Sequence, residues 1–339
     1  MWRKVKFSSA GKIPNKFLNE IVFKHLGSPS DYILYGPGIG RDAAAIKLSN
    51  DKILIVKSDP ITGSVRHIGR YAVIINANDI AVLGATPMFF LSTILLPINA
   101  SLYDLEIICQ DIDKAAKELN ISVIGGHSEV TAGIMNPILC GSMLGETSSE
   151  KLITANSRHG DKLVMTKFAA IEGTAILAWD KEDFLQKKMK KNSLETAKKF
   201  INYLSILKDA QLALKIGGIT AMHDPTEGGI LNGIFEICKA SGVGAIVYKE
   251  RIPIAKETQE ICKILNLNPL RLISSGTLLL TIKPQNLTQI ITILAKHRIK
   301  ATCIGEIRKE KEIHLLRDDG TQELIAEHNQ DQLWTVFSK

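Results

Sequence analysis

Hydrophobic and polar positions follow two different rhythms along the first half of the chain. In three segments the apolar residues recur every three or four positions, the spacing that places them on one face of a helix: 14–26, 65–83 and 102–119. Between and after these segments lie short, mostly apolar runs typical of strands: 53–56, 88–96, 121–124 and 138–144. Alternating helices and strands predict an α/β (α+β) fold for this part of the chain.

A polar stretch separates this region from a second set of elements. Residues 145–160 are rich in Ser, Thr, Asn and charged residues, a composition typical of a linker. Five further strand-like runs follow: 162–166, 244–248, 278–282, 301–307 and 312–316. We therefore expect two domains, residues 1–150 and residues 151–339.

Composition narrows the class of protein. The 339 residues carry 42 Lys and Arg against 35 Asp and Glu, a formal charge of +7, and the five cysteines are widely spaced. No apolar run reaches the roughly 20 residues of a membrane span, so we expect a cytoplasmic protein without a membrane partner. The basic balance raises the alternative of nucleic-acid binding, but the densest lysine cluster, 187–199, lacks the interleaved aromatic residues of a stacking surface. We expect a solvated helix face there and no nucleic-acid partner.

Acidic residues beside glycines are the strongest chemical signal. Asp42 follows the glycine-rich loop that contains Gly38 and Gly40, Asp59 follows a predicted strand, and Asp79 shares a helix face with Asn76. Mg²⁺ takes carboxylate oxygens, and glycine-rich turns let backbone N–H groups approach phosphates. Asp and Gly are also ordinary turn residues, so each position alone has that simpler reading. No phosphate-binding loop of the G-x-x-x-x-G-K-[ST] or G-x-G-x-x-G type is present.

The segment from Asp79 to Pro87 resembles the D-x4-G-A-x-P signature of the aminoimidazole ribonucleotide synthetase (PurM-like) superfamily. That superfamily includes purine enzymes, thiamine monophosphate kinase, selenophosphate synthetase and hydrogenase maturation factors of the HypE type. Further similar segments occur in the same order: Gly40-Arg41-Asp42-Ala43-Ala44, Ser58-Asp59, Gly125-Gly126-His127-Ser128-Glu129, Asp224-Pro225-Thr226-Glu227-Gly228-Gly229 and Ser274-Ser275-Gly276-Thr277.

The resemblance implies a two-domain fold, in which the N-terminal sheet pairs with that of a second subunit into a dimeric β-barrel and a C-terminal α/β domain covers the substrate. It implies ATP and Mg²⁺ as cofactors, with metal ligands at Asp42, Asp59, Asp79 and Asp224. The same four residues would contact the nucleotide together with Gly38, Gly40, Asn76, Gly125, Gly126, Glu129 and Thr226. Catalysis would rest on Asp79, Asp42 and Lys12. Lys12 has a second reading, a solvated lysine before a helix.

Several residues depart from the pattern of the superfamily. Arg41 and His127 stand where relatives carry acidic residues, and Glu227 stands where HypE-type sequences carry Arg. The printed sequence ends in Ser338-Lys339, whereas HypE ends in a reactive cysteine, and Cys303 lies in a predicted strand. We therefore expect no reaction on a C-terminal thiol. The first cysteine is Cys109, which argues against selenophosphate synthesis.

These observations favour an ATP- and Mg²⁺-dependent enzyme that phosphorylates or dehydrates an amide- or carbamoyl-type substrate, small or carrier-bound. Two alternatives remain open. One is a nucleotide-binding maturation partner or scaffold without catalysis, and the other is a small-molecule kinase of the thiamine monophosphate kinase type. A partner from hydrogenase maturation is also compatible with the resemblance.

Overall fold

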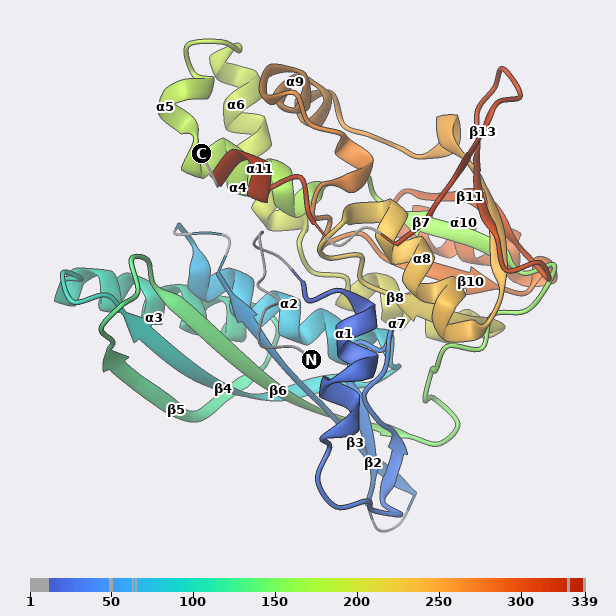
Figure 1. The fold of residues 1–339 in the computed structure, drawn as a ribbon, viewed down its shortest axis with the longest axis horizontal. Helices are drawn as coiled ribbons and strands as arrows, with labels where there is room; N and C mark the ends of the chain where they lie inside the picture. The colour runs from blue at the N-terminus through green and yellow to red at the C-terminus, as the bar shows by residue number, and fades with distance from the viewer. Residues whose placement is uncertain (1–11, 49–50, 63, 65, 328–329, 338–339) are drawn as a thin grey trace.

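The computed structural model describes residues 12–48, 51–62, 64, 66–327 and 330–337, which build two mixed β-sheets and the helices that cover them (Figure 1). The first half of the chain contains α1 (Asn15–Glu20), the 3₁₀-helix η2 (Val22–Lys24), β1 (Ile33–Tyr35), β2 (Ala44–Lys47), β3 (Lys52–Ile61), α2 (Ile68–Val82), β4 (Thr86–Leu96), α3 (Leu102–Glu118), β5 (Ser122–Val130) and β6 (Ile138–Ser148).

The N-terminal sheet has the strand order β1-β2-β3-β6-β4-β5. All neighbouring strands are antiparallel except β4 and β5, and β3 pairs with β6 from Lys52↔Ser148 to Ile61↔Leu139. In β6 every second residue is buried, the alternation of a sheet with one covered face. β5 lies at one edge of the sheet and all of its residues are exposed. This half of the structure therefore presents an open sheet edge.

Helix α2 is the centre of the N-terminal domain. All but one of its residues are buried, and its apolar side chains surround the whole helix instead of forming one stripe. α2 packs against β3, β6 and α3 and also contacts α7 (Leu207–Ile216) and β8 (Ile219–His223) of the second half. A helix that is apolar on all sides is an interior helix, which explains why α2 lies between the N-terminal sheet and the C-terminal domain.

The second half of the chain forms a seven-stranded sheet in the order β13-β12-β9-β11-β7-β10-β8. Its strands are β7 (Lys162–Thr166), β8, β9 (Gly244–Tyr248), β10 (Leu279–Ile282), β11 (Ala301–Arg308), β12 (Ile313–Leu316) and β13 (Gln322–Leu324). Its helices are α4 (Ile171–Asp180), α5 (Glu182–Leu185), α6 (Lys191–Lys198), η3 (Lys199–Tyr203), α7, α8 (Gly229–Ser241), η4 (Lys249–Arg251), α9 (Lys256–Leu265), η5 (Pro269–Arg271), η6 (Pro284–Asn286), α10 (Leu287–Lys296) and α11 (Trp334–Phe337).

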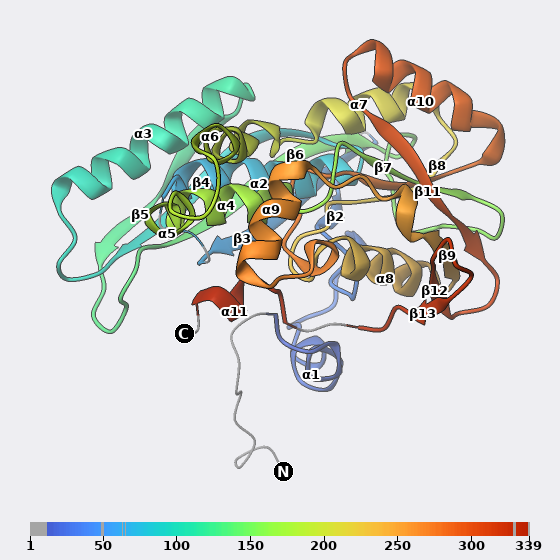
Figure 2. The same ribbon diagram turned by 90° about the horizontal axis from the view of Figure 1, so that it is seen from above.

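Both faces of this second sheet are covered. Val164 of β7 belongs to a hydrophobic core shared with α7, α10 and α2, whereas its neighbours Leu163 and Met165 belong to a second core shared with α8. Adjacent residues of a strand point to opposite faces, so β7 must be apolar throughout. In the view of Figure 2, α7 and α10 lie together at one side of the sheet and α8 at the other. The sequence therefore predicted the two-domain α/β architecture correctly.

Several predicted boundaries are wrong. The segment 14–26 breaks into α1 and η2, β3 extends to Ile61 so that Asp59 lies inside a strand, and β6 continues through the first part of the expected linker. The expected start of α2 at Val65 lies outside the described residues. Lys198, which we expected on a solvated helix face, is buried and bridges Glu182 and Glu195 at 2.6 and 2.9 Å. In the part of the chain that the structure describes, no helix combines the length and apolar character needed to cross a membrane.

Candidate functional site

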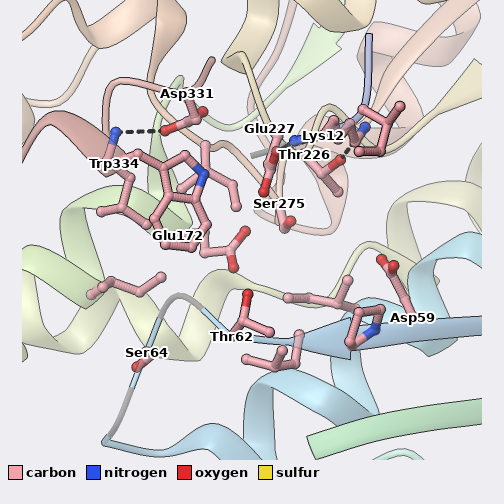
Figure 3. A pocket seen from close by; sticks show the side chains of 17 residues that line it. Lys12, Asp59, Thr62, Ser64, Glu172, Thr226, Glu227, Ser275, Asp331 and Trp334 are labelled. Atoms are coloured by element: carbon pink, nitrogen blue, oxygen red, sulfur yellow. Dashed lines mark hydrogen bonds between the residues drawn. The ribbon is translucent and has the colours of Figure 1, made fainter. Parts of the chain in front are cut away.

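A cavity of about 390 Å³ lies between the two domains. The N-terminal domain contributes Asp59 and Ile61 from the end of β3 and Ile75 from α2, and the C-terminal domain contributes Glu172 from α4 and Thr226 from the loop after β8. Figure 3 shows these polar side chains converging on the cavity from opposite sides. Its volume lies within the range of about 300–1,000 Å³ that is usual for small-molecule sites.

An ion pair marks the edge of the cavity. Lys57 on β3 places its Nζ 3.2 Å from Asp79 Oδ2 and 3.8 Å from Asp59 Oδ2. Asp79 is buried, and burial raises its pKa to about 7 although Lys57 opposes the shift. Asp59 and Asp42 add to the rise because like charges disfavour a further carboxylate. Three acidic side chains that are far apart in the sequence therefore form one electrostatic cluster.

His223 connects two more carboxylates. Its Nδ1 lies 2.8 Å from Asp42 Oδ2, and its Nε2 lies 2.8 Å from Glu236 Oε2. Burial alone would lower the pKa of His223, but the two carboxylates raise it to about 10. The ring is thus an imidazolium that donates from both nitrogens. Asp42 belongs to the N-terminal domain and Glu236 to α8, so this cation holds the two domains together.

Lys12 lies beside the same group of residues. Its Nζ is 3.1 Å from Thr226 Oγ1 and 3.5 Å from Glu236 Oε1, and its backbone N–H donates to Glu227 Oε2 at 2.7 Å. These contacts hold the segment before α1 against the loop that follows β8. Lys12 therefore lines the cavity directly, and its expected role in binding phosphate stays a prediction.

Asn78 of α2 links the domains on the buried side of the cluster. Its Nδ2 donates to Asp224 Oδ2 at 2.8 Å and to the Leu204 carbonyl at 2.9 Å, while its Oδ1 accepts from the Ile206 N–H at 3.0 Å. Asp224 also accepts from the Gly276 N–H at 3.3 Å. Burial and the charge of Asp79 raise the pKa of Asp224 well above its ordinary value.

The inner wall of the cavity carries a second group of polar residues. Glu172 and Ser275 are buried, and neither Glu172 Oε2 nor Ser275 Oγ has a hydrogen-bond partner of good geometry among the described residues. Burial raises the pKa of Glu172 to about 8, although Ser275 lies close enough to oppose part of that rise. Asp331 accepts from the N–H groups of Gly228 and Leu333 and so fixes the C-terminal segment as another wall.

The acidic cluster suits a hard cation chemically but not geometrically. Within the described ranges, no group of three or more His, Cys, Asp or Glu side chains is arranged to hold a metal ion. The Lys57 ammonium lies beside both Asp79 and Asp59, His223 occupies Asp42, and Asn78 binds Asp224. The residues present therefore do not fit a magnesium ion held by the protein alone, and the four metal ligands expected from the sequence stay a prediction.

The glycine-rich loop binds the domains to each other instead of facing the cavity. Gly40 has φ 70°, and a Cβ there would clash with the carbonyl of Glu236, so only glycine lets the loop lie against α8. Arg41 turns back to the Gly36 carbonyl at 3.0 Å, and Asn76 donates to the Ala72 and Asp59 carbonyls. Gly38 and Asn76 are not among the residues that line the cavity.

The predicted residues on β5 lie elsewhere. Gly125 and Gly126 line a separate cavity of about 350 Å³ between the sheet and α3, together with His127. Glu129 accepts from Thr131 and lies 3.1 Å from His127, and both side chains of the His127–Glu129 pair are exposed. Within one chain the structure does not bring these residues to the acidic cluster.

Sequence reasoning missed the residues that complete the site, namely Lys57, Asn78, Glu172, His223, Glu236 and Asp331. His223 directly precedes Asp224 in a segment that was recognised, and Lys57 and Asn78 each lie within two residues of a predicted aspartate. Their closeness to these segments was the available signal. Glu172, Glu236 and Asp331 carried none.

Comparison with protein families identifies the chain. Residues 40–147 match the AIR synthase related protein N-terminal domain, and residues 158–317 match the AIR synthase related protein C-terminal domain. The two matches cover most of the chain and fall on the two sheets in order. The chain therefore belongs to the AIR synthase related (PurM-like) family, as the sequence motifs predicted.

Proteins with several different named activities are similar to this chain in sequence. A hydrogenase expression/formation protein of Methanocaldococcus jannaschii is 28% identical, over 89% of this chain and 90% of its own length. Carbamoyl dehydratase HypE of Cupriavidus necator is 25% identical, over 79% of this chain and 77% of its own. Thiamine-monophosphate kinase of Pyrococcus horikoshii is 25% identical, over 84% of this chain and 88% of its own length.

Solved structures share the fold. The hydrogenase maturation protein HypE in complex with ATP aligns with a TM-score of 0.70 at 19% identity, over 94% of this chain and 95% of that one. AaThiL complexed with AMPPCP and TMP aligns with a TM-score of 0.75 at 16% identity, over 97% of this chain and 99% of that one. A chain of the HypE–HypF complex aligns with a TM-score of 0.74 at 20% identity, over 92% of this chain and 99% of that one.

Proposed function

We propose that this chain is an ATP-using enzyme that phosphorylates a small acceptor held in the interdomain cavity. The supporting observation is that one cavity contains both side chains able to bind phosphate and a separate inner wall able to hold an acceptor. Lys12, Thr226 and Asp59, which belongs to the acidic cluster, line the cavity, and Glu172 and Ser275 lie on its inner wall. The relatives named as a dehydratase and a kinase, and the solved structures that hold ATP or AMPPCP, support the choice of nucleotide.

The chemistry follows from phosphoryl transfer. The bond between the β-phosphate oxygen and the γ-phosphorus breaks, ADP leaves, and an acceptor oxygen forms the new bond to phosphorus. In this proposal Lys12 Nζ and Thr226 Oγ1, which lie 3.1 Å apart, donate hydrogen bonds to phosphate oxygens, and the Lys12 ammonium neutralises charge that develops on them. The acceptor proton passes to Asp59, a partly exposed carboxylate of the same cavity. With a primary amide as acceptor, the proton that passes to Asp59 comes from the amide nitrogen; the C–O bond then breaks, the oxygen leaves as phosphate, the remaining N–H proton passes to solvent and a nitrile forms, so that the amide is dehydrated.

Dimer formation is part of the proposal. β5 is an exposed edge strand whose side chains include Val123, Ile124 and Val130. An exposed apolar edge strand is a template for pairing with another chain. A second subunit that pairs there would cover Gly125, Gly126 and Glu129, so these predicted nucleotide residues would act at an interface between subunits. The expected maturation partner is supported by the HypE–HypF complex, in which HypE binds another protein.

Calorimetric titration of the full chain with ATP and Mg²⁺ tests the proposal. We expect saturable binding that is abolished in Asp79→Asn and Asp42→Asn and weakened at least about tenfold, or 1.4 kcal/mol, in Lys12→Ala. Lys16→Ala is the matched control, because Lys16 is an exposed lysine of the adjoining helix. Undiminished binding in both aspartate variants would contradict the assignment.

Turnover separates the enzyme from the alternative of a nucleotide-binding scaffold. We expect phosphate or ADP release to rise when acceptors from a panel of amides, carbamoyl compounds and alcohols are added to the ATP complex. Binding of ATP without acceptor-dependent release across that panel supports the scaffold instead.

A further inference from the structure

The inner wall of the interdomain cavity combines apolar surface with two unpartnered polar atoms. Ile61, Ile75, Ile176, Ile273 and Leu333 line the same cavity as Glu172 and Ser275. In Figure 3 the carboxyl group of Glu172 and the hydroxyl group of Ser275 lie near each other and face the open space. Leaving a buried polar atom without a hydrogen bond is unfavourable, so a ligand that supplies hydrogen bonds to these two atoms would bind favourably here.

We propose that Glu172 and Ser275 bind an uncharged substrate group that both donates and accepts a hydrogen bond, carried on a short apolar body. A hydroxyl or a carboxamide has this chemistry, and the experiment below distinguishes the two. This inference rests on the proposed function, because it describes the acceptor of that reaction.

A protonated Glu172 on the inner wall disfavours charged ligands. No Lys, Arg or His side chain forms an ion pair with Glu172 in the described part of the chain, and Glu172 is only 3% exposed. The pKa of about 8 keeps Glu172 protonated at neutral pH, so the carboxylic acid offers one donor and one acceptor. A carboxylate ligand would place a second acidic group beside the buried Glu172, where like charges repel. An ammonium ligand would have to ionise Glu172 and create a buried ion pair, whose desolvation offsets much of its attraction.

A four-membered series with one alkyl chain tests the proposal. Valeramide, 1-pentanol, valerate and pentylamine each have five carbons and differ in the terminal polar group, and titrations extend to about 10 mM so that weak binding is measured. Ligand-observed NMR on the full chain at pH 7 without nucleotide should show that valeramide, pentanol or both bind at least about fivefold more tightly than valerate and pentylamine. The stronger of the two neutral ligands identifies the polar group.

Variants assign the binding to the wall. Glu172→Ala and Ser275→Ala should reduce binding of the neutral ligands at least about fivefold, whereas Glu172→Gln, which keeps one donor and one acceptor, should retain it. Glu195→Gln on α6 is the matched control outside the cavity. The inference is wrong if a charged member of the series binds as tightly as the neutral ones, if no member binds, or if both alanine variants bind like the wild type.

ATP titration of the same preparations separates the two proposals. If ATP binds and the preference for neutral ligands is missing, this inference fails while the proposed function stands. If neutral ligands bind to Glu172 and Ser275 but ATP does not bind at all, the proposed function fails instead.

Discussion

Lys57 Nζ lies 3.2 Å from Asp79 Oδ2, so an ammonium group of the protein neutralises the aspartate on which the family resemblance rests. Asp79 begins the D-x4-G-A-x-P segment, and the resemblance assigns it to a metal ion. In this chain a lysine two residues before Asp59 on the same face of β3 supplies the positive charge. The lysine is 21% exposed and its partner Asp79 only 3%, so the pair is screened less than a surface ion pair.

Replacing Lys57 should open a site for a divalent cation. In Lys57→Met the Asp79 and Asp59 carboxylates lose their ammonium partner, and their mutual repulsion favours an ion with two charges. We expect Mn²⁺ affinity without nucleotide, measured by electron paramagnetic resonance, to increase at least about tenfold, or 1.4 kcal/mol. Lys52→Met is the control, because Lys52 lies on the same strand in an exposed ion pair with Glu146. Equal Mn²⁺ binding by the wild type and Lys57→Met would show that Lys57 does not compete with a metal ion.

Removing the imidazolium of His223 should destabilise the protein strongly. His223→Gln leaves Asp42 and Glu236 as buried carboxylates without the cation between them, and breaking a buried pair in this way costs about 3–5 kcal/mol. Urea denaturation measures the loss. The control His314→Gln removes a largely exposed pair with Glu312 and should change the free energy of unfolding by about 0.5 kcal/mol or less.

The same variant has a defined pH dependence. The pKa of His223 in the folded chain is about 10, above its ordinary value of about 6.5. Its stabilisation is therefore fully present below about pH 6.5 and is lost as the pH rises through 10. The difference in unfolding free energy between the wild type and His223→Gln should shrink steadily between pH 7 and pH 10. A difference that stays constant over that range would refute the imidazolium assignment.

Glu172 should make the protein less stable as the pH rises. Its pKa of about 8 in the folded chain lies above the ordinary value of about 4.3, so the folded state keeps a proton that the unfolded chain loses. Between these two values the free energy of unfolding should fall by up to about 1.4 kcal/mol per pH unit through this group. Glu172→Gln removes that contribution, and chemical denaturation from pH 5 to pH 8 measures it. An unchanged slope in Glu172→Gln, relative to Glu195→Gln, would mean that Glu172 ionises normally.

A charge on β5 should break the proposed dimer. Ile124 is 53% exposed on the edge strand of the N-terminal sheet, and Ile124→Lys places an ammonium in the pairing surface. Sedimentation velocity should show a dimer for the wild type and a monomer for this variant. Leu324→Lys is the control, because Leu324 is 57% exposed on β13, the edge of the other sheet. A dimer that survives Ile124→Lys but dissociates in Leu324→Lys would place the interface on the wrong sheet.

Local sequence patterns revealed the two-domain fold and the segments of the site, but not how charges are balanced within it. Asp42, Asp79 and Asp224 stand in recognisable segments, and the structure gathers them around α2. Lys57 escaped notice because a lysine in an alternating strand looks like a solvated residue, and only the pairing of β3 beside α2 turns it inward. Glu172 looked like an ordinary polar residue in the first turn of a helix. Its burial results from packing against distant parts of the chain, and the residues next to it in the sequence do not indicate it.

The predicted boundary at residue 150 is not tested by the structure or the relatives. β6 ends at Ser148 and β7 begins at Lys162, so a division there remains the natural proposal. The dimeric barrel, the magnesium ligands and the individual nucleotide contacts also stay predictions, because each depends on a molecule other than this chain.

The three hydrogen bonds of Asn78 have a consequence for how the chain comes apart. One side chain of α2 satisfies two backbone groups and a carboxylate of the other half, at Leu204, Ile206 and Asp224. A protease that cuts the connection between β6 and β7 would therefore leave two fragments that remain bound to each other. The chain should melt in one transition, nicked or intact, because neither half can unfold without exposing polar groups that the other half satisfies.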